Sequence, residues 1–184
     1  MLTYLDVLLS SAEKWLGQPA LPAGTLYFHV HNPLLQSSNG MTLEQAQSEM
    51  LKRFKMKGLL LADREVIAKM DGQLERGYSD ILPVAVKADG GFYSSASVAS
   101  PEQWDTLLSS VRHVITEIGT RITEGDVDIA PYRIGTETAC THCVYRPVCR
   151  FDETLDGSSY HVMSKHGKDK VWELLQGMNE GNDA

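Results

Sequence analysis

Hydrophobic residues recur with helical spacing near the start of the chain and again after residue 100. Between residues 2 and 16, Leu or Ala returns at every third or fourth position, which predicts an amphipathic helix. The second stretch begins with Ser100, Pro101 and Gln103, a capping box with proline at the first helical position. One apolar face then continues to Ile122, before Gly125. We expect that face to pack in a core or against another domain.

Three shorter helices are predicted from their end signals. Thr42 and Gln45 form a capping box for a helix that runs to about Lys57, with Gly58 behind it. Asp63 caps a helix over residues 64–70. A last helical stretch covers residues 170–176 and leads into a polar tail.

Alternating apolar and polar residues predict the strands. Residues 25–31 alternate until Asn32 and Pro33, and residues 82–87 and 91–95 flank a turn-forming Ala-Asp-Gly, which indicates a hairpin. Helices and about three strands give a mixed α/β (α+β) chain with an incomplete sheet packed by helices. The first helix has neither a capping residue nor a strand before it, so we expect the segment to continue a longer chain.

Composition is that of a globular protein, with 184 residues, 42% hydrophobic and 22% charged. The apolar runs are too short to cross a bilayer, and the first residues lack a secretory signal, so we expect a cytoplasmic protein without membrane association. The net charge of -7 argues against a free-standing nucleic-acid binder, which usually carries a basic excess.

All three cysteines, Cys140, Cys143 and Cys149, fall within the stretch TACTHCVYRPVCRFD. A two-residue gap lets two sulfurs face one metal or cluster. An odd count and the missing export signal disfavour disulfides, while unligated thiols remain an alternative. Zinc would need an imidazole and an iron–sulfur cluster would need a fourth thiolate, and spacing alone leaves both open. The candidate imidazoles are those of His142, His161 and His166.

The stretch GDVDIAPYRIGTETACTHCVYRPVCRFD resembles the C-terminal iron–sulfur segment of the B subunit of bacterial AddAB/RexAB-type ATP-dependent helicase–nucleases. The resemblance extends upstream through LTYLDVLL, PAGTLYFHVHNP, KGLLLAD, MDG and ILPVAVKADGGF, so it reaches from the start of the chain to about Asp152. The matching positions are Asp126, Asp128, Pro131, Tyr132, Arg133, Cys140, Cys143, Tyr145, Cys149, Phe151 and Asp152.

The resemblance implies the C-terminal portion of a RecB-like PD-(D/E)XK nuclease domain. It implies a [4Fe-4S] cluster with Cys140, Cys143 and Cys149 as three of its four ligands, the fourth lying upstream of this sequence. Such a cluster stabilises the domain by closing a long loop. Arg146 and Arg150 flank the loop and would offset the negative charge of the cluster.

The resemblance also implies that the Mg2+-binding Asp and Asp/Glu-x-Lys motifs lie upstream. Only Tyr4 would remain, as the last residue of a Gln-x3-Tyr motif and in a supporting role. Tyr27, His29 and His31 share one face of the predicted strand and are expected to form a packed polar face. Asp169, between Lys168 and Lys170, is expected at the solvated surface.

We therefore expect residues 1–152 to form the C-terminal part of the nuclease domain, with the iron–sulfur loop at 136–152, and residues 153–184 to add a short helix and a polar tail. The parent would act with an ATP-hydrolysing A subunit on double-stranded DNA ends and single-stranded DNA in recombinational repair. This chain alone would be inactive. The alternatives are a Cys3His zinc-binding interaction module and a metal-free α/β fold with bystander cysteines.

Overall fold

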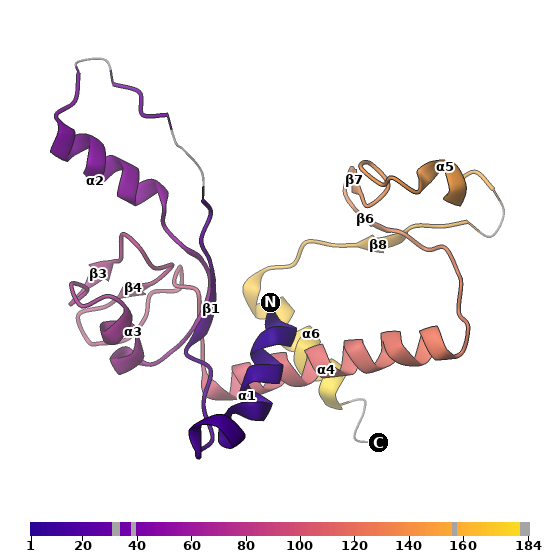
Figure 1. Ribbon diagram of the computed structural model, residues 1–184, viewed down its shortest axis with the longest axis horizontal. Helices are drawn as coiled ribbons and strands as arrows, with labels where there is room; N and C mark the ends of the chain where they lie inside the picture. The colour runs from indigo at the N-terminus through magenta and orange to yellow at the C-terminus, as the bar shows by residue number, and fades with distance from the viewer. Residues whose placement is uncertain (31–33, 38–39, 156–157, 181–184) are drawn as a thin grey trace. The chain divides into compact units, whose positions relative to one another are not determined.

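The computed structural model describes residues 1–30, 34–37, 40–155 and 158–180 (Figure 1). The chain divides into two compact units, Met1–Val111 and Arg112–Ala184. The first unit contains α1 (Leu2–Leu16), β1 (Gly24–Tyr27), α2 (Leu43–Arg53), β2 (Lys57–Leu61), α3 (Arg64–Met70), β3 (Gly77–Tyr78), β4 (Ala85–Val86) and β5 (Val98–Ala99). Helix α4 (Pro101–Thr123) carries the boundary between the units.

The main sheet of the first unit has three strands in the order β1-β2-β5. β1 runs antiparallel to β2, and β5 runs parallel to it. The central strand, β2, is one that the sequence patterns did not predict, since the helix expected to reach Lys57 ends at Arg53. The reason is that a continuous apolar run such as Leu59–Leu61 has no alternation to mark it as a strand. The prediction of a mixed α/β chain with an incomplete sheet is confirmed.

Gly58 explains how β1 and β2 come so close. It lies opposite Leu26 in the register and has φ +154°. A Cβ at this position would overlap the carbonyl oxygen of Thr25 on the neighbouring strand. Only glycine therefore fits between the two backbones here.

The expected hairpin is present but shorter than predicted. Around the turn at residues 88–90, Val86 bridges Phe92, and the backbone N–H of Lys87 donates to the carbonyl of Gly91 at 2.7 Å. β4 also pairs with β3, a strand that the sequence patterns did not predict. The strand predicted at 25–31 is also shorter, since β1 ends at Tyr27, and residues 31–33 lie outside the described residues.

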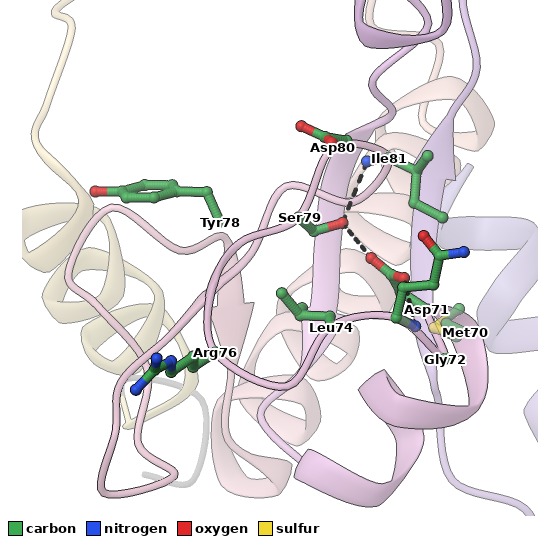
Figure 2. A pocket seen from close by; sticks show the side chains of 10 residues that line it. Met70, Asp71, Gly72, Leu74, Arg76, Tyr78, Ser79, Asp80 and Ile81 are labelled. Atoms are coloured by element: carbon green, nitrogen blue, oxygen red, sulfur yellow. Dashed lines mark hydrogen bonds between the residues drawn. The ribbon is translucent and has the colours of Figure 1, made fainter. Parts of the chain in front are cut away.

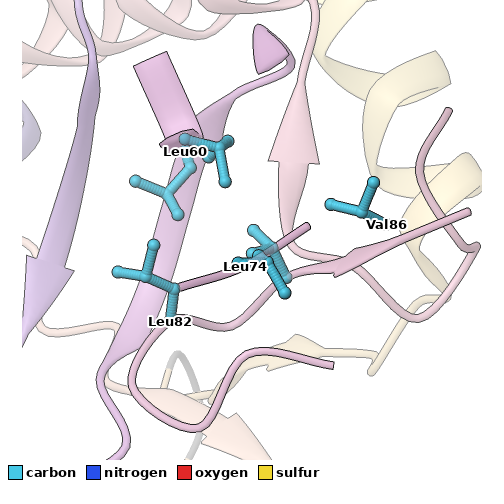
Figure 3. Packing of buried hydrophobic residues seen from close by; sticks show 6 residues of the cluster. Leu60, Leu74, Leu82 and Val86 are labelled. Atoms are coloured by element: carbon cyan, nitrogen blue, oxygen red, sulfur yellow. The ribbon is translucent and has the colours of Figure 1, made fainter. Parts of the chain in front are cut away.

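The core of the first unit collects apolar side chains from β2, α3 and the segments that follow them (Figure 3). Leu60, Ile67, Leu82 and Val86 are at most 1% exposed. Burying each such side chain contributes about 1.5–3 kcal/mol. Further members of the cluster are Leu74 and Val84, with Leu26, Met56, Phe92 and Val98 packed against them.

The predicted helix caps are confirmed. Thr42 and Gln45 form the capping box of α2, and Ser100 and Gln103 exchange the same pair of hydrogen bonds before α4. The Asp63 carboxylate accepts the backbone N–H groups of Glu65 at 2.7 Å and Val66 at 3.2 Å. Helices α2, α3 and α4 thus begin where local side-chain chemistry predicts.

The apolar face of α4 is only partly buried. Trp104 is fully buried and Leu108 is 5% exposed, whereas Ile115 and Ile122 are 46% and 70% exposed. The first turns of the stripe thus pack in the core, and the later ones are exposed in this chain, where packing against another domain stays a prediction. Helical spacing marks a face as apolar, but the burial of that face depends on what other segments lie against it.

The second unit contains β6 (Tyr132–Ile134), β7 (Glu137–Thr138), α5 (Arg146–Cys149), β8 (His161–Met163) and α6 (Lys168–Glu180). Its sheet has the order β7-β6-β8, with β8 parallel to β6. Residues 125–151 therefore contain two strands and a helical turn, where short turns alone were expected. The last helix is longer than the predicted 170–176.

Candidate functional site

The three cysteines lie in the segment between β7 and the end of α5, which we call the cysteine loop (residues 139–150). The turns of this loop are held by backbone hydrogen bonds from Cys143 N to the Cys140 oxygen and from Arg146 N to the Cys143 oxygen, both 3.4 Å. Cys149 closes α5 with a bond of 2.9 Å to the Tyr145 oxygen. Successive tight turns thus bring the cysteines into one short loop.

All three cysteines are free thiols, with Cys140 and Cys149 half-buried and Cys143 exposed. Three thiols in one loop have the donor chemistry that both zinc and iron–sulfur clusters use. In the described part of the chain, however, no group of three or more His, Cys, Asp or Glu side chains is placed to hold a metal ion. The three thiols have the chemistry of a thiolate-ligated centre, but the described residues of the loop do not place a complete set of ligands around one point.

The end of the cysteine loop has an unusual backbone conformation. Arg150 follows Cys149 with φ 50°, and it is the one non-glycine residue of the described chain with positive φ. This left-handed cap ends α5 and redirects the chain toward Phe151. Pro147, inside α5, fixes its own φ and stiffens the approach to Cys149.

A cluster of polar and aromatic side chains connects β6 to the segment after the cysteine loop. The Arg133 guanidinium donates to both carboxylate oxygens of Glu153 at 2.9 Å and lies 4.8 Å from the Tyr160 ring centroid. Tyr160 meets Phe151 edge-on at 4.7 Å. These contacts connect β6 to a segment about 20 residues later in the sequence. We call Arg133, Phe151, Glu153 and Tyr160 the Arg133 cluster.

Two members of the Arg133 cluster, Glu153 and Tyr160, were not predicted, because residues 153–184 were expected to add only a short helix and a polar tail. The structure instead pairs Tyr132 with His161 and Ile134 with Met163 in parallel. The available signal was the short run Tyr-His-Val-Met at 160–163, which includes an aromatic and a β-branched residue. The run is too short for its pattern to separate strand from coil.

The acidic stretch before β6 ends α4. Asp126 accepts a 2.6 Å ion pair from Arg121 and a backbone bond from Asp128 N at 3.0 Å. The Asp128 N–H, and secondarily the Arg121 guanidinium, lower the pKa of the Asp126 carboxyl. After the cysteine loop, hydrogen bonds from the hydroxyl and then the backbone N–H of Thr154 lower the pKa of Asp152. Both aspartates therefore organise turns.

The remaining predicted residues are distributed over both units. Tyr4 lies on α1 and is 78% exposed. Tyr27 is 59% exposed at the end of β1 and His29 lies beyond it, so the two do not share a face of the strand as expected, and His31 lies outside the described residues. His161 contacts Tyr132 edge-on, while His142 and His166 are exposed.

Asp169 lies in the first turn of α6 at the surface, and its neighbour Lys170 pairs with Glu173 at 2.7 Å. Arg146 and Arg150, at the two ends of α5, are exposed as well. In the ranges that the structure describes, no helix is both long and apolar enough to span a membrane.

Comparison with protein families matches residues 1–150 to the PD-(D/E)XK nuclease superfamily. The chain belongs to this superfamily. The match ends at Arg150, so β8 and the Tyr160 contacts lie beyond it. The fold expected from the resemblance is confirmed.

Several curated relatives of this nuclease-superfamily chain are named as the B subunit of an ATP-dependent helicase/deoxyribonuclease. They include proteins from Oceanobacillus iheyensis, 41% identical over 182 residues, Geobacillus kaustophilus, 46% over 183, and Bacillus subtilis strain 168, 39% over 183. These alignments cover 98–100% of this chain and 16% of each relative. The chain thus spans about a sixth of the length of these relatives, and the expected similarity to such a B subunit is confirmed.

Proposed function

We propose that this chain forms the C-terminal part of the nuclease domain in the B subunit of an ATP-dependent helicase/deoxyribonuclease. The observation that carries the proposal is 39–46% identity over nearly all of the chain to relatives with that name. The whole protein would act in the cytoplasm with an ATP-hydrolysing A subunit. It would process double-stranded DNA ends into single strands for recombinational repair.

In this proposal the catalytic carboxylates and lysine are supplied from outside the 184 residues. No Asp/Glu-x-Lys sequence occurs in the chain, and PD-(D/E)XK chemistry needs one beside a second acidic residue to hold Mg2+ and orient the attacking water. Tyr4 keeps a supporting role, since its exposed side chain lies on α1 and can contact a neighbouring segment. The chain alone therefore has no nuclease activity.

The cysteine loop would supply three thiolates, from Cys140, Cys143 and Cys149, to a [4Fe-4S] cluster whose fourth thiolate comes from another part of the parent protein. The support is their free state and their placement on consecutive tight turns. The cluster, when bound, would connect two distant parts of the chain and stabilise the domain. The Arg133 cluster holds the segment after Cys149 against β6.

The alternative is a Cys3His zinc site within this chain. The same three cysteines support it, and His142 is the imidazole closest to them in sequence. Zinc would need its fourth ligand from these 184 residues, whereas the cluster would take its fourth ligand from elsewhere. Metal analysis of the chain alone separates the two.

The experiment compares the 184-residue chain with the complete B subunit that contains it, co-purified with its A subunit. We expect the complete complex to degrade linear duplex DNA in an ATP- and Mg2+-dependent way and to contain iron and sulfide. The Cys143→Ser complex should lose most of its iron. The chain alone should show no degradation.

Two outcomes would contradict the proposal. The first is degradation of linear DNA by the chain alone with Mg2+, abolished by Tyr4→Phe. The second is stoichiometric zinc in the chain alone, lost on Cys143→Ser, which would favour the zinc module. Unchanged iron content and thermal stability of the complex after Cys143→Ser would instead favour bystander cysteines.

A further inference from the structure

Two tyrosines stand side by side on the two segments of the first unit that pair with β4. Tyr78 pairs with Ala85 in the β3–β4 register, and the backbone N–H of Tyr93 donates to the Ala85 carbonyl at 3.0 Å. Residues directly opposite each other on antiparallel strands share a face of the sheet. Tyr78 and Tyr93 therefore flank Ala85, whose small side chain leaves room for their rings to stack, with centroids 5.9 Å apart and planes at 15°.

The two rings remain open to solvent. Tyr78 is 69% exposed and Tyr93 is 42% exposed, and the core cluster of this unit includes neither. The Lys87 ammonium lies 6.0 Å from the Tyr93 ring centroid. The pair thus forms an exposed aromatic platform with the Lys87 ammonium at one end. Neither ring is part of the core cluster.

A cavity of about 240 Å3 adjoins Tyr78. Lys55, Tyr78, Ser95 and Ser97 line it together with apolar residues, and none of its lining residues is acidic. The Lys55 ammonium is held in place by a 2.7 Å hydrogen bond to the Ser79 carbonyl. The volume is below the range of about 300–1,000 Å3 that holds drug-sized ligands, and it suits a single flat ring.

The neighbouring carboxylates do not line the platform cavity. Asp71 and Asp80 line a separate cavity, and Asp71 is engaged by the Ser79 hydroxyl at 2.7 Å. Figure 2 shows the Tyr78 ring projecting away from this hydrogen bond. Asp89 accepts the N–H of Gly91 within the hairpin turn. The Lys55 ammonium is therefore the charged group that lines the platform cavity, and the Lys87 ammonium lies beside the neighbouring Tyr93 ring.

We propose that Tyr78, Tyr93, Lys55 and Lys87 form a binding site for single-stranded DNA, with one unstacked base on the Tyr78 ring and the flanking phosphates beside the two lysines. The proposal rests on the function proposed above. Aromatic rings bind any base through its flat face, and cations follow the backbone. Duplex DNA hides these faces in its own stack, so the site selects single strands.

The test measures binding of a labelled short oligothymidylate to the full 184-residue chain by fluorescence anisotropy at low salt. Tyr78→Ala should weaken binding about 5- to 160-fold, the range for losing one stacked base, while Tyr78→Phe retains it. Lys87→Gln should reduce the slope of log K against log salt by about 0.7, as expected for one lost phosphate contact on a single strand.

Matched controls come from the same unit. Trp15 is an aromatic residue with 67% exposure, and Lys14 is an exposed lysine beside it on α1, so Trp15→Ala and Lys14→Gln remove the same groups away from the platform. Both variants should bind as the wild type does. An abasic oligomer of equal length and a duplex should bind more weakly than oligothymidylate.

The proposal is overturned if wild type and Tyr78→Ala bind oligothymidylate equally well. It is also overturned if the wild type binds oligothymidylate and the abasic oligomer equally well. Both outcomes count regardless of whether the complex degrades DNA. Equal losses in Trp15→Ala and Tyr78→Ala also overturn it, because the binding would then be non-specific. If the complex lacks ATP-dependent degradation while binding by the chain still depends on Tyr78, the proposed function fails and the site stands.

Discussion

Replacing Ser79 by alanine should destabilise the first unit, although it removes a single oxygen atom. Ser79 is 2% exposed, and its hydroxyl makes three hydrogen bonds. It donates to Asp71 Oδ2 at 2.7 Å and accepts the backbone N–H of Ile81 at 3.2 Å (Figure 2). It also accepts the backbone N–H of Leu82 at 2.8 Å. This one oxygen organises the turn that connects β3 to β4.

The loss of stability in Ser79→Ala follows from the groups that lose their hydrogen-bond partner when the hydroxyl is removed. The Leu82 N–H is buried, so it loses its acceptor without gaining water, at about 1–3 kcal/mol. The Ile81 N–H and the Asp71 carboxylate are less buried, so water replaces part of what they lose. We therefore expect Ser79→Ala to lower the free energy of unfolding by about 2–4 kcal/mol, a large share of the 5–15 kcal/mol typical of a domain.

Urea unfolding followed by far-UV circular dichroism measures the change in the free energy of unfolding. Hydrogen exchange of the Leu82 amide measures the local loss of protection at the broken hydrogen bond. Ser109→Ala is the matched control, because Ser109 is an exposed serine within α4 where alanine is a better helix former. The control should change stability by less than about 0.5 kcal/mol. A similarly small effect of Ser79→Ala, with unchanged exchange at Leu82, would refute the reasoning.

Three further predictions concern single positions. Gly58→Ala should prevent β1 from pairing with β2, because the added Cβ would overlap the Thr25 carbonyl. The control, Gly119→Ala, lies in an open position inside α4 and should raise stability by up to about 1 kcal/mol. Thermal unfolding measures the stability of both variants. Asp63→Ala should cost about 0.5–2 kcal/mol through loss of two capping bonds, and Asp63→Asn should cost less, both by the same assay. The pKa of Asp126 is lowered in the folded state, so the stabilisation it gives is present above its ordinary value of 3.8 and is lost as the pH falls through the lower folded value. In an NMR titration of that carboxyl, Arg121→Gln should move the midpoint upward but only partway, since the Asp128 N–H is the larger cause; an unchanged midpoint would contradict the assignment of Arg121.

Local chemistry made most helices predictable. Caps at Thr42, Asp63 and Ser100 act within three residues, so their effect is visible in the sequence and appears unchanged in the structure. The hairpin near Gly90 was predictable for the same reason. Its ends were not, because strand length depends on the partner strand and not on the turn.

The central strand, β2, could not be predicted from nearby residues. The sequence at 57–61 is a short apolar run after a helix, and the same pattern would suit a helix end. It becomes β2 because β1 and β5 supply hydrogen-bonding partners on both sides. Those partners lie about 30 to 40 residues away in sequence, so their contribution has no local signal.

The candidate site also has features that the sequence determined and features that only the tertiary structure decided. The sequence by itself determined that the only three thiols of the chain, Cys140, Cys143 and Cys149, fall within ten residues, and its similarity to known nucleases determined the superfamily. Only the tertiary structure decided that Tyr160 and Glu153 pack on Arg133, and that Tyr78 and Tyr93 stack over Ala85. Chemical identity belongs to each residue alone, whereas proximity is set by pairing between segments whose contacts form only when the chain folds.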